Sequence, residues 1–395
     1  MKWSSAVSDN PFLSEAAREC AAALGAELGD LSPDLTVVFV SADHASEYAK
    51  VPELLREHCG DGLLVGCSSG GVIGAGREVE NRPGFAIASA NLPDVELVPF
   101  HINSDDVPDA DAPPDSWEAL VGADPSEDPQ FLLLADPFSS RADDLVVGLD
   151  YAFPRSVKIG GIASGGGQPG SNAFFLGHEL FDGGVVGVAM SGALTVDTVV
   201  AQGCRPVGWP LQVTSCTKNI LEEVDGSAPF EVLRQIYAKS SERDQQLFRH
   251  SMFIGVAMDE FNDSPQLGDF KIRNIVGVNE KTGIVVVDEA LREGQTVQFH
   301  LRDKETASQD LNSLLTRYSG ENKVEDGSGA LLFSCLGRGS GLYGRPDHDT
   351  DMFRDVVRPL PLTGFFCNGE IGPVGDTTFL HGYTSSFGIF RPEEE

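Results

Sequence analysis

The chain has 395 residues, more than a single hydrophobic core usually holds, so two domains or one duplicated domain are expected. It carries 60 acidic and 28 basic residues, and the net charge of -32 disfavours binding to nucleic acid or to an anionic membrane surface. No run of about 18 apolar residues occurs, and the first ten residues hold no apolar signal core, so the sequence predicts a cytosolic protein.

The first part of the chain alternates helix and strand patterns. Apolar residues recur on one helical face over 13–24, which predicts an opening helix. The β-branched run 36–40 predicts a buried strand, 45–58 a helix, and 62–66 a second strand. A strand, a crossover helix and a strand in this order imply parallel pairing.

Later segments continue with many short strands and few helices. Between 105 and 128, proline and acidic residues predominate, which predicts a surface excursion. Strands are expected at 85–89, 95–100, 131–136, 173–176, 185–190, 195–201, 211–214, 219–224, 252–257, 271–278, 283–287, 295–301 and 330–337, and helices at 229–239 and 307–318.

Three glycine-rich segments resemble one another, at 64–74, 158–167 and 362–372. Each lies downstream of an apolar strand that ends in a small or polar loop. The chain therefore reuses one unit of strand, helix, strand and glycine-rich turn. The predicted fold is α/β, with duplicated β-α-β units, mixed sheets packed face to face and helices outside, a layered α-β-β-α sandwich.

Nucleophile motifs are present but incomplete. Gly66 to Gly70 matches the pattern of a nucleophile elbow after a strand, yet residues 70–76 are a poor helix sequence, which argues against Ser68 as a hydrolase nucleophile. Cys335 or Cys367, with His381 as the base, stays open as an alternative, against the simpler interpretation of buried thiols on strands.

Metal and cofactor motifs are not expected. The seven cysteines are odd in number and scattered, which favours reduced thiols, and no C-x-x-C or H-x-x-x-H spacing occurs. We therefore expect neither a metal nor a cofactor.

The segment 339–344 satisfies G-x-G-x-x-G, but the residues after it do not continue as a dinucleotide-binding helix. It predicts either a loop between Arg338 and Arg345 that holds a small carboxylate or phosphate, or an ordinary glycine turn. The alternating acids Asp347, Asp349 and Asp351 break the calcium-loop pattern and are interpreted as a solvated helix N-terminus.

Polar residues end the apolar strands of the third unit. Cys335 and Arg338 follow one strand, and Asn368 and Glu370 follow the next. If these strands are parallel neighbours, their ends meet at one edge of the sheet, where open α/β sheets bind ligands. His381, on the following strand, could complete such a site.

These C-terminal runs resemble a known family. Residues 335–339, 361–373 and 381–384, with 270–277 from the same half, resemble the C-terminal part of FIST (F-box and intracellular signal transduction) proteins, and 66–74 with 84–87 resemble the N-terminal part. The expected organisation is an N-terminal helix and lead-in at 1–33, a FIST N-like domain at 34–222 and a FIST C-like domain at 223–395.

The resemblance implies a sensory protein for a small polar ligand such as an amino acid. It implies Arg273 and Arg338 as countercharges for a carboxylate, and Asn368 and Glu370 as partners of an amino or amide group, with Cys335 and His381 beside them. The structural alternatives are an internal ion pair of Arg338 with Glu370, and a turn at Asn368-Gly369.

The sequence contains no visible F-box, kinase or methyl-accepting segment, so signalling is expected to pass through a partner protein. A hydrolase or transferase using Cys335, Cys367 or Ser68 is the competing function, and a scaffold without ligand is a third. Shared sheet edges would allow a homodimer.

Overall fold

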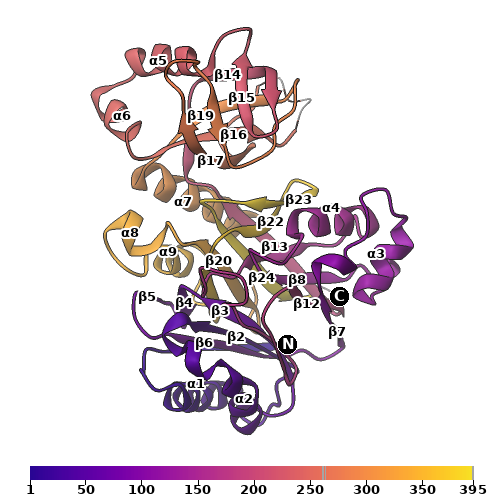
Figure 1. Cartoon of the computed structure of the whole chain (residues 1–395). Helices are drawn as coiled ribbons and strands as arrows, with labels where there is room; N and C mark the ends of the chain where they lie inside the picture. The colour runs from indigo at the N-terminus through magenta and orange to yellow at the C-terminus, as the bar shows by residue number, and fades with distance from the viewer. Residues whose placement is uncertain (260–261, 263, 394–395) are drawn as a thin grey trace. The chain divides into compact units, whose positions relative to one another are not determined.

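The computed structural model describes residues 1–259, 262 and 264–393, and it divides into two compact units. The first comprises Met1–Val200, Asn312–Leu380 and Thr384–Glu395, and the second comprises Ala201–Leu311 and His381–Tyr383. The predicted α/β class is confirmed: mixed sheets pack together, and helices such as α1 (Leu13–Leu28) and α2 (Val51–Cys59) lie outside them (Figure 1). In the described part of the chain, no helix has the length and hydropathy needed to cross a bilayer.

The first unit consists of three copies of one supersecondary pattern, as the three glycine-rich segments predict. The first copy holds β1 (Lys2–Ser8), α1 (Leu13–Leu28), β2 (Leu35–Ser41), η1 (Ala42–Lys50), α2 (Val51–Cys59), β3 (Leu63–Ser69), β4 (Gly71–Gly74), β5 (Arg77–Glu80) and β6 (Phe85–Asn91). The second copy holds β7 (Val95–Ile102), α3 (Pro114–Val121), β8 (Gln130–Ala135), α4 (Ala142–Ala152), β9 (Lys158–Ile162), β10 (Phe174–Leu176), β11 (Glu179–Phe181) and β12 (Val185–Gly192).

The third copy is split by the second unit. It holds β13 (Leu194–Ala201) and then, after the second unit, β20 (Gly329–Cys335), α8 (Gly339–Tyr343), α9 (His348–Val356), β21 (Leu362–Cys367), β22 (Glu370–Val374), β23 (Thr377–His381) and β24 (Ser385–Pro392). Helix α7 (Lys304–Glu321) leads back from the second unit into this copy.

Each copy lends its hairpin to the sheet of another copy. The three sheets run β1-β6-β2-β3-β10-β11, β7-β12-β8-β9-β22-β23 and β13-β24-β20-β21-β4-β5 over the described residues. In each, two strands pair in parallel, namely β2 with β3, β8 with β9 and β20 with β21. Residues far apart in sequence are therefore placed side by side by the exchanged hairpins.

One glycine in each copy is fixed by this parallel pairing. A Cβ at these glycines would lie within about 2 Å of a carbonyl oxygen on the neighbouring strand, which no side chain tolerates. The glycines are Gly66, Gly160 and Gly364, which face Val38, Leu133 and Leu332.

The core lies where the inner faces of the three sheets meet. Phe39 of the first sheet stacks on Phe365 of the third with ring centroids 4.7 Å apart, and Leu132 and Ile159 of the second sheet belong to the same cluster. Helices α1 and α2 cover the outer face of the first sheet, and α3 and α4 that of the second. Burial of these faces is the main force that holds the copies together.

Strand β1 and helix α3 are among the elements of the first unit that were not predicted from the sequence. Strand β1 pairs antiparallel with β6, although its polar residues Ser4, Ser5 and Ser8 gave no apolar run. The segment predicted as a surface excursion contains α3, whose Trp117 is only 2% exposed and packs in the second copy's outer core. Trp117, the one tryptophan of this segment, was the signal for a buried helix, but the acidic composition led to the prediction of a surface segment.

Over its described residues, the second unit is a closed barrel of six strands, a feature that the sequence did not suggest. Its strands run β14 (Cys204–Thr217), β15 (Ile220–Val224), β18 (Val285–Val287), β17 (Phe270–Val278), β16 (Met252–Ala257) and β19 (Thr296–Arg302) around the barrel. Helices α5 (Pro229–Lys239) and α6 (Glu242–Leu247) follow β15. The interior is filled by apolar side chains, including Val256, Val297 and Phe299.

Candidate functional site

Glu370 occupies an apolar position of the repeated pattern. Each exchanged hairpin pairs with a strand that carries one of the three close-approach glycines, Gly66, Gly160 or Gly364. One hairpin residue lies opposite the residue that follows this glycine. That position holds Val72 and Phe174 in two of the exchanged hairpins and Glu370 in β22. All three side chains are fully buried. The third copy therefore buries a carboxylate where its two siblings bury hydrocarbon, at a cost in desolvation that packing alone does not require.

The Glu370 carboxylate is held by Thr384, at the start of β24. Its Oε2 accepts hydrogen bonds from the Thr384 amide at 3.1 Å and from the Thr384 hydroxyl at 2.7 Å. The Glu370 charge also acts on the Cys367 thiol. Burial is the largest cause that raises the pKa of Cys367, and Glu370, Cys67 and Cys335 raise it further.

Arg338 forms a buried ion pair with Asp349. Arg338 Nε and Nη2 lie 2.8 and 3.2 Å from the two carboxylate oxygens, and Nη2 also donates to the Tyr343 hydroxyl at 2.6 Å. Both charged side chains are nearly inaccessible, at 0% and 3%. Burial would raise the pKa of Asp349, but the Arg338 guanidinium and three side-chain hydrogen bonds lower it well below its ordinary range. Within the described residues, Arg338 Nη1 is buried without a hydrogen-bond partner.

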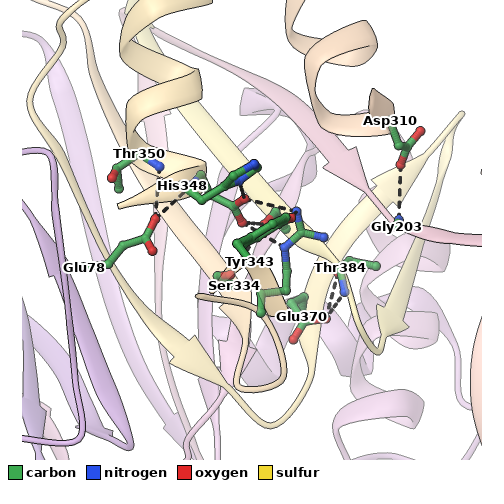
Figure 2. A network of polar contacts seen from close by, with 12 residues as sticks. Glu78, Gly203, Asp310, Ser334, Tyr343, His348, Thr350, Glu370 and Thr384 are labelled. Atoms are coloured by element: carbon green, nitrogen blue, oxygen red, sulfur yellow. Dashed lines mark hydrogen bonds and ion pairs between the residues drawn. The ribbon is translucent and has the colours of Figure 1, made fainter. Parts of the chain in front are cut away.

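Further polar groups extend this pair into a network. Ser385 donates to Asp349 at 2.5 Å, and His348 Nδ1 lies 2.9 Å from the same carboxylate. The rings of Tyr343 and His348 stack 3.4 Å apart. Figure 2 shows Tyr343 and His348 between Glu370 with Thr384 on one side and Glu78 with Thr350 on the other. Since Thr384 and Ser385 are consecutive, one short segment serves both the Glu370 and the Asp349 carboxylates.

Glu78 of the first copy caps a helix of the third. Its Oε1 accepts hydrogen bonds from the backbone amides of Asp349 and Thr350, at 3.0 and 3.1 Å, at the start of α9. In return, Asp347 accepts from the Glu78 amide at 2.6 Å. Burial and the nearby Asp349 carboxylate raise the pKa of Glu78 to about 8, so its side chain is largely protonated at neutral pH.

The structure places four of the predicted site residues in the first unit. Cys335 is half-buried at the end of β20, in register with Cys367, and lies close enough to Arg338 to contribute to its field. Arg338 bonds to Asp349 rather than forming the ion pair with Glu370 that was one alternative. Asn368 is exposed, and its side-chain amide donates to the Ala163 carbonyl at 3.0 Å, a turn-holding contact.

The other two predicted residues lie in the second unit. Arg273, on β17, pairs with Glu289, which Lys271 also contacts at 2.6 Å. Burial raises the pKa of Glu289, but Arg273 and Lys271 together hold it below its ordinary value. His381 is 3% exposed at the end of β23. The role of all six residues in ligand binding stays a prediction.

Two of the three candidate nucleophiles, Cys367 and Ser68, are held in ways that suppress their reactivity. Burial raises the pKa of the Cys367 thiol well above that of an ordinary thiol, and a protonated thiol is a poor nucleophile. Ser68 is fully buried, donates to Asn172 at 3.3 Å and accepts from the Ala173 amide at 2.9 Å. These contacts pin Ser68 as a structural hydroxyl.

Two sequence interpretations near Arg338 are corrected by the structure. Asp349 is not part of a solvated helix N-terminus: it is 2% exposed and pairs with Arg338. The glycine-rich segment after Arg338 is not an open loop but contains the short helix α8, whose Ser340 amide donates to Glu80 at 2.8 Å. Glu78, Asp349 and Ser385 were not predicted as site residues, because the exchanged hairpin brings Glu78 to α9 and the folding of the third copy brings Ser385 to Asp349. The only local signal was the run of acids after 346.

Among the described residues, no group of three or more His, Cys, Asp and Glu side chains has the arrangement of a metal site.

Family models cover most of the chain. The FIST N domain matches residues 34–227, and the FIST C domain matches residues 229–373. This finding confirms the resemblance carried by the glycine-rich turns and the C-terminal runs.

Full-length relatives occur in mycobacteria. An uncharacterised protein of Mycobacterium tuberculosis is 34% identical over 386 residues, covering 97% of this chain and 98% of the relative. The human F-box only protein 22 is 24% identical over 128 residues, covering 28% of this chain and 32% of that protein. The crystal structure of cyanuric acid hydrolase from A. caulinodans aligns over 100% of both chains at a TM-score of 0.34 and 10% identity, a likeness too low to support an argument.

Proposed function

Because this chain belongs to the FIST family, we propose that it is a sensory protein that binds a small polar ligand, of the amino acid type, at the Glu370 network and reports it to a signalling partner. FIST domains are associated with signal transduction and small-ligand sensing. The ligand and the partner of this chain are our proposal.

The observation that carries the proposal is the break in the repeat at Glu370. Two copies bury Val72 and Phe174 at this position, so the fold itself does not need a charge there. A buried carboxylate is retained at a cost, and binding an ammonium group is a use that would offset it. Arg338 Nη1, a buried donor with no acceptor in the described residues, suits a ligand oxygen in the same network.

Burial of the network suits a sensor rather than a passive carrier. Glu370, Thr384 and Ser385 are each at most 1% exposed, so a ligand reaches the carboxylate only when the segment that covers it moves. Binding is then coupled to a conformational change, and the bound state is the state that a partner can distinguish. An enzyme using Cys335, with its half-buried thiol, is the alternative proposal. Labelling by iodoacetamide separates the two, because a catalytic thiol reacts much faster than free cysteine.

We expect the Glu370→Gln variant to lose its response to ligand. A thermal-shift screen of the wild-type chain against the twenty amino acids is expected to find at least one that raises the melting temperature. Glutamine keeps the shape of Glu370 but removes the charge that attracts an ammonium group, so the affinity should fall by about tenfold or more.

The matched control is Asp136→Asn. Asp136 is also a fully buried carboxylate, but it belongs to the second copy, where it holds a turn through Phe138 and Ser139. This variant should be less stable yet keep the ligand-induced shift. Equal loss of the shift in both variants, or no stabilising amino acid at all, would contradict the proposal.

A further inference from the structure

One face of β19 carries buried polar side chains. Gln298, His300 and Arg302 alternate along the strand with apolar residues of the barrel core, so they share the opposite face. Their exposed fractions are only 5%, 0% and 8%. A strand face of this composition is costly to bury unless its polar groups have partners.

Arg302 has an unused hydrogen-bonding edge. Its guanidinium lies 5.0 Å from the centre of the Tyr383 ring, and both Nε and Nη2 are buried without a hydrogen-bond partner among the described residues. These two nitrogens form the edge of a guanidinium that grips a carboxylate in a bidentate manner. The adjacent acid, Asp303, is engaged by Arg205 and by the Thr306 amide.

Arg273 of the same barrel shows how a compensated guanidinium differs. It pairs with Glu289, an acid that Lys271 shares. No ion pair with an acidic side chain is formed by Arg302 within 1–259, 262 and 264–393. A buried guanidinium of this kind calls for an external anion.

His300 and Gln298 supply acceptors beside this edge. His300 Nδ1 lies 3.0 Å from the Gln298 carbonyl oxygen, which can only accept, so Nδ1 carries the hydrogen and Nε2 is an acceptor. Burial lowers the pKa of His300 to about 4, so the ring is neutral at pH 7. His300 Nε2 and Gln298 Oε1 are buried with no donor in the described part of the chain. Same-face neighbours on a strand are about 7 Å apart, so donor edge and acceptors fit two ends of one small molecule.

Apolar groups flank the polar stripe. The Phe270 ring lies 4.8 Å from that of His300, and the Phe253 ring lies 4.3 Å from that of Tyr383. Gly255, opposite Gln298, lets the His300 ring pack against the backbone of β16, because a Cβ there would lie 2.4 Å from that ring.

Tyr383 lies over this face in a strained conformation. Its φ is 69°, a region that bulky residues rarely adopt, and its hydroxyl is hydrogen-bonded to the Asn274 side chain. Together with its contacts to the Phe253 ring and the Arg302 guanidinium, this hydrogen bond holds Tyr383 over the polar face.

We propose that this face of β19 binds a small carboxylate that also carries a hydroxyl or amino donor, with Arg302 as the countercharge and Tyr383 as its cover. The Arg302 edge takes the carboxylate, and His300 or Gln298 accepts from the second group. The site lies on the outer face of strand β19 of the barrel and uses none of the residues around Glu370, so it goes beyond the proposed function, and either can fail alone.

The test uses 4-hydroxybenzoate, a carboxylate with a hydroxyl at its far end, titrated calorimetrically into the full-length chain. The wild type should bind it, and should bind the uncharged 4-hydroxybenzamide about tenfold more weakly or less. Benzoate, which lacks the hydroxyl, should fall between them. Arg302→Met should weaken 4-hydroxybenzoate binding by about tenfold or more without lowering the melting temperature, since it replaces a buried charge by an apolar chain.

Lys271→Met is the matched control, because it removes a cation of the same barrel that already has its acid, Glu289. It should keep wild-type affinity for 4-hydroxybenzoate even if its stability falls. Should Arg302→Met not fold, Arg302→Lys decides: a point charge without the flat edge should bind several-fold more weakly. Unchanged affinity in the Arg302 variants, or no binding by the wild type at millimolar 4-hydroxybenzoate, overturns the proposal.

Discussion

Replacing Asp349 with alanine is expected to lower the free energy of unfolding by about 3–5 kcal/mol, because it leaves the Arg338 charge buried with no counterion. Arg338 is 0% exposed, and its Nε and Nη2 both depend on the Asp349 carboxylate. The substitution also removes the acceptor of the Ser385 hydroxyl. Urea unfolding followed by tryptophan fluorescence measures the change.

Asp351→Ala is the matched control for this prediction. Asp351 lies two residues further along α9 and pairs with Arg345 and Arg354, but its side chain is 27% exposed and its partners are about half exposed. Water screens such pairs, so this substitution should cost less than about 1 kcal/mol. The double variant Arg338→Met, Asp349→Leu removes both charges and should be more stable than Asp349→Ala. Equal costs for Asp349→Ala and Asp351→Ala would refute the buried-pair account.

The sequence was most informative where the signal was local. The three glycine-rich turns predicted the repeated unit, since one glycine per copy is imposed by close backbone approach at Gly66, Gly160 and Gly364. Apolar runs predicted β2, β8 and β20, because both faces of a central strand are covered. Strand β1 was not predicted, because its serines are buried by pairing with β6 and do not form an apolar run.

The candidate site could be predicted only in part. Glu370 stood out because it follows an apolar strand, and the structure finds it fully buried. Asp349 could not be predicted as the partner of Arg338. It is buried because the exchanged hairpin places strand β5 of the first copy, with Glu78, against the start of α9. A helix N-terminus rich in acids is ordinarily solvated, and local spacing contains nothing about this exchange. Arg302 was not predicted as a site residue either. It lies on a strand of a closed barrel, and the pattern of that strand does not indicate that the barrel closes.

Raising the pH through the range of about 4.5 to 8 is expected to destabilise the wild-type chain through Glu78. The pKa of Glu78 is raised from 4.5 to about 8 in the folded state, first by burial and then by the Asp349 charge. The folded chain therefore binds a proton that the unfolded chain releases. Its stabilising contribution is complete below about pH 4.5 and is lost as the pH rises through about 8. A shift of this size corresponds to roughly 5 kcal/mol.

Glu78→Gln isolates this contribution, because glutamine imitates the protonated carboxyl group and still accepts hydrogen bonds from the Asp349 and Thr350 amides. The difference in unfolding free energy between wild type and variant, measured in urea at pH 5 to 9, should grow in favour of the variant as the pH rises. The same difference at every pH would mean that Glu78 is already ionised in the folded state. Since Glu78 caps the helix that carries Asp349, its ionisation also places a second negative charge beside the Arg338 pair. Loss of ligand-induced stabilisation above pH 8 in the wild type, but not in Glu78→Gln, is therefore expected from the same proton.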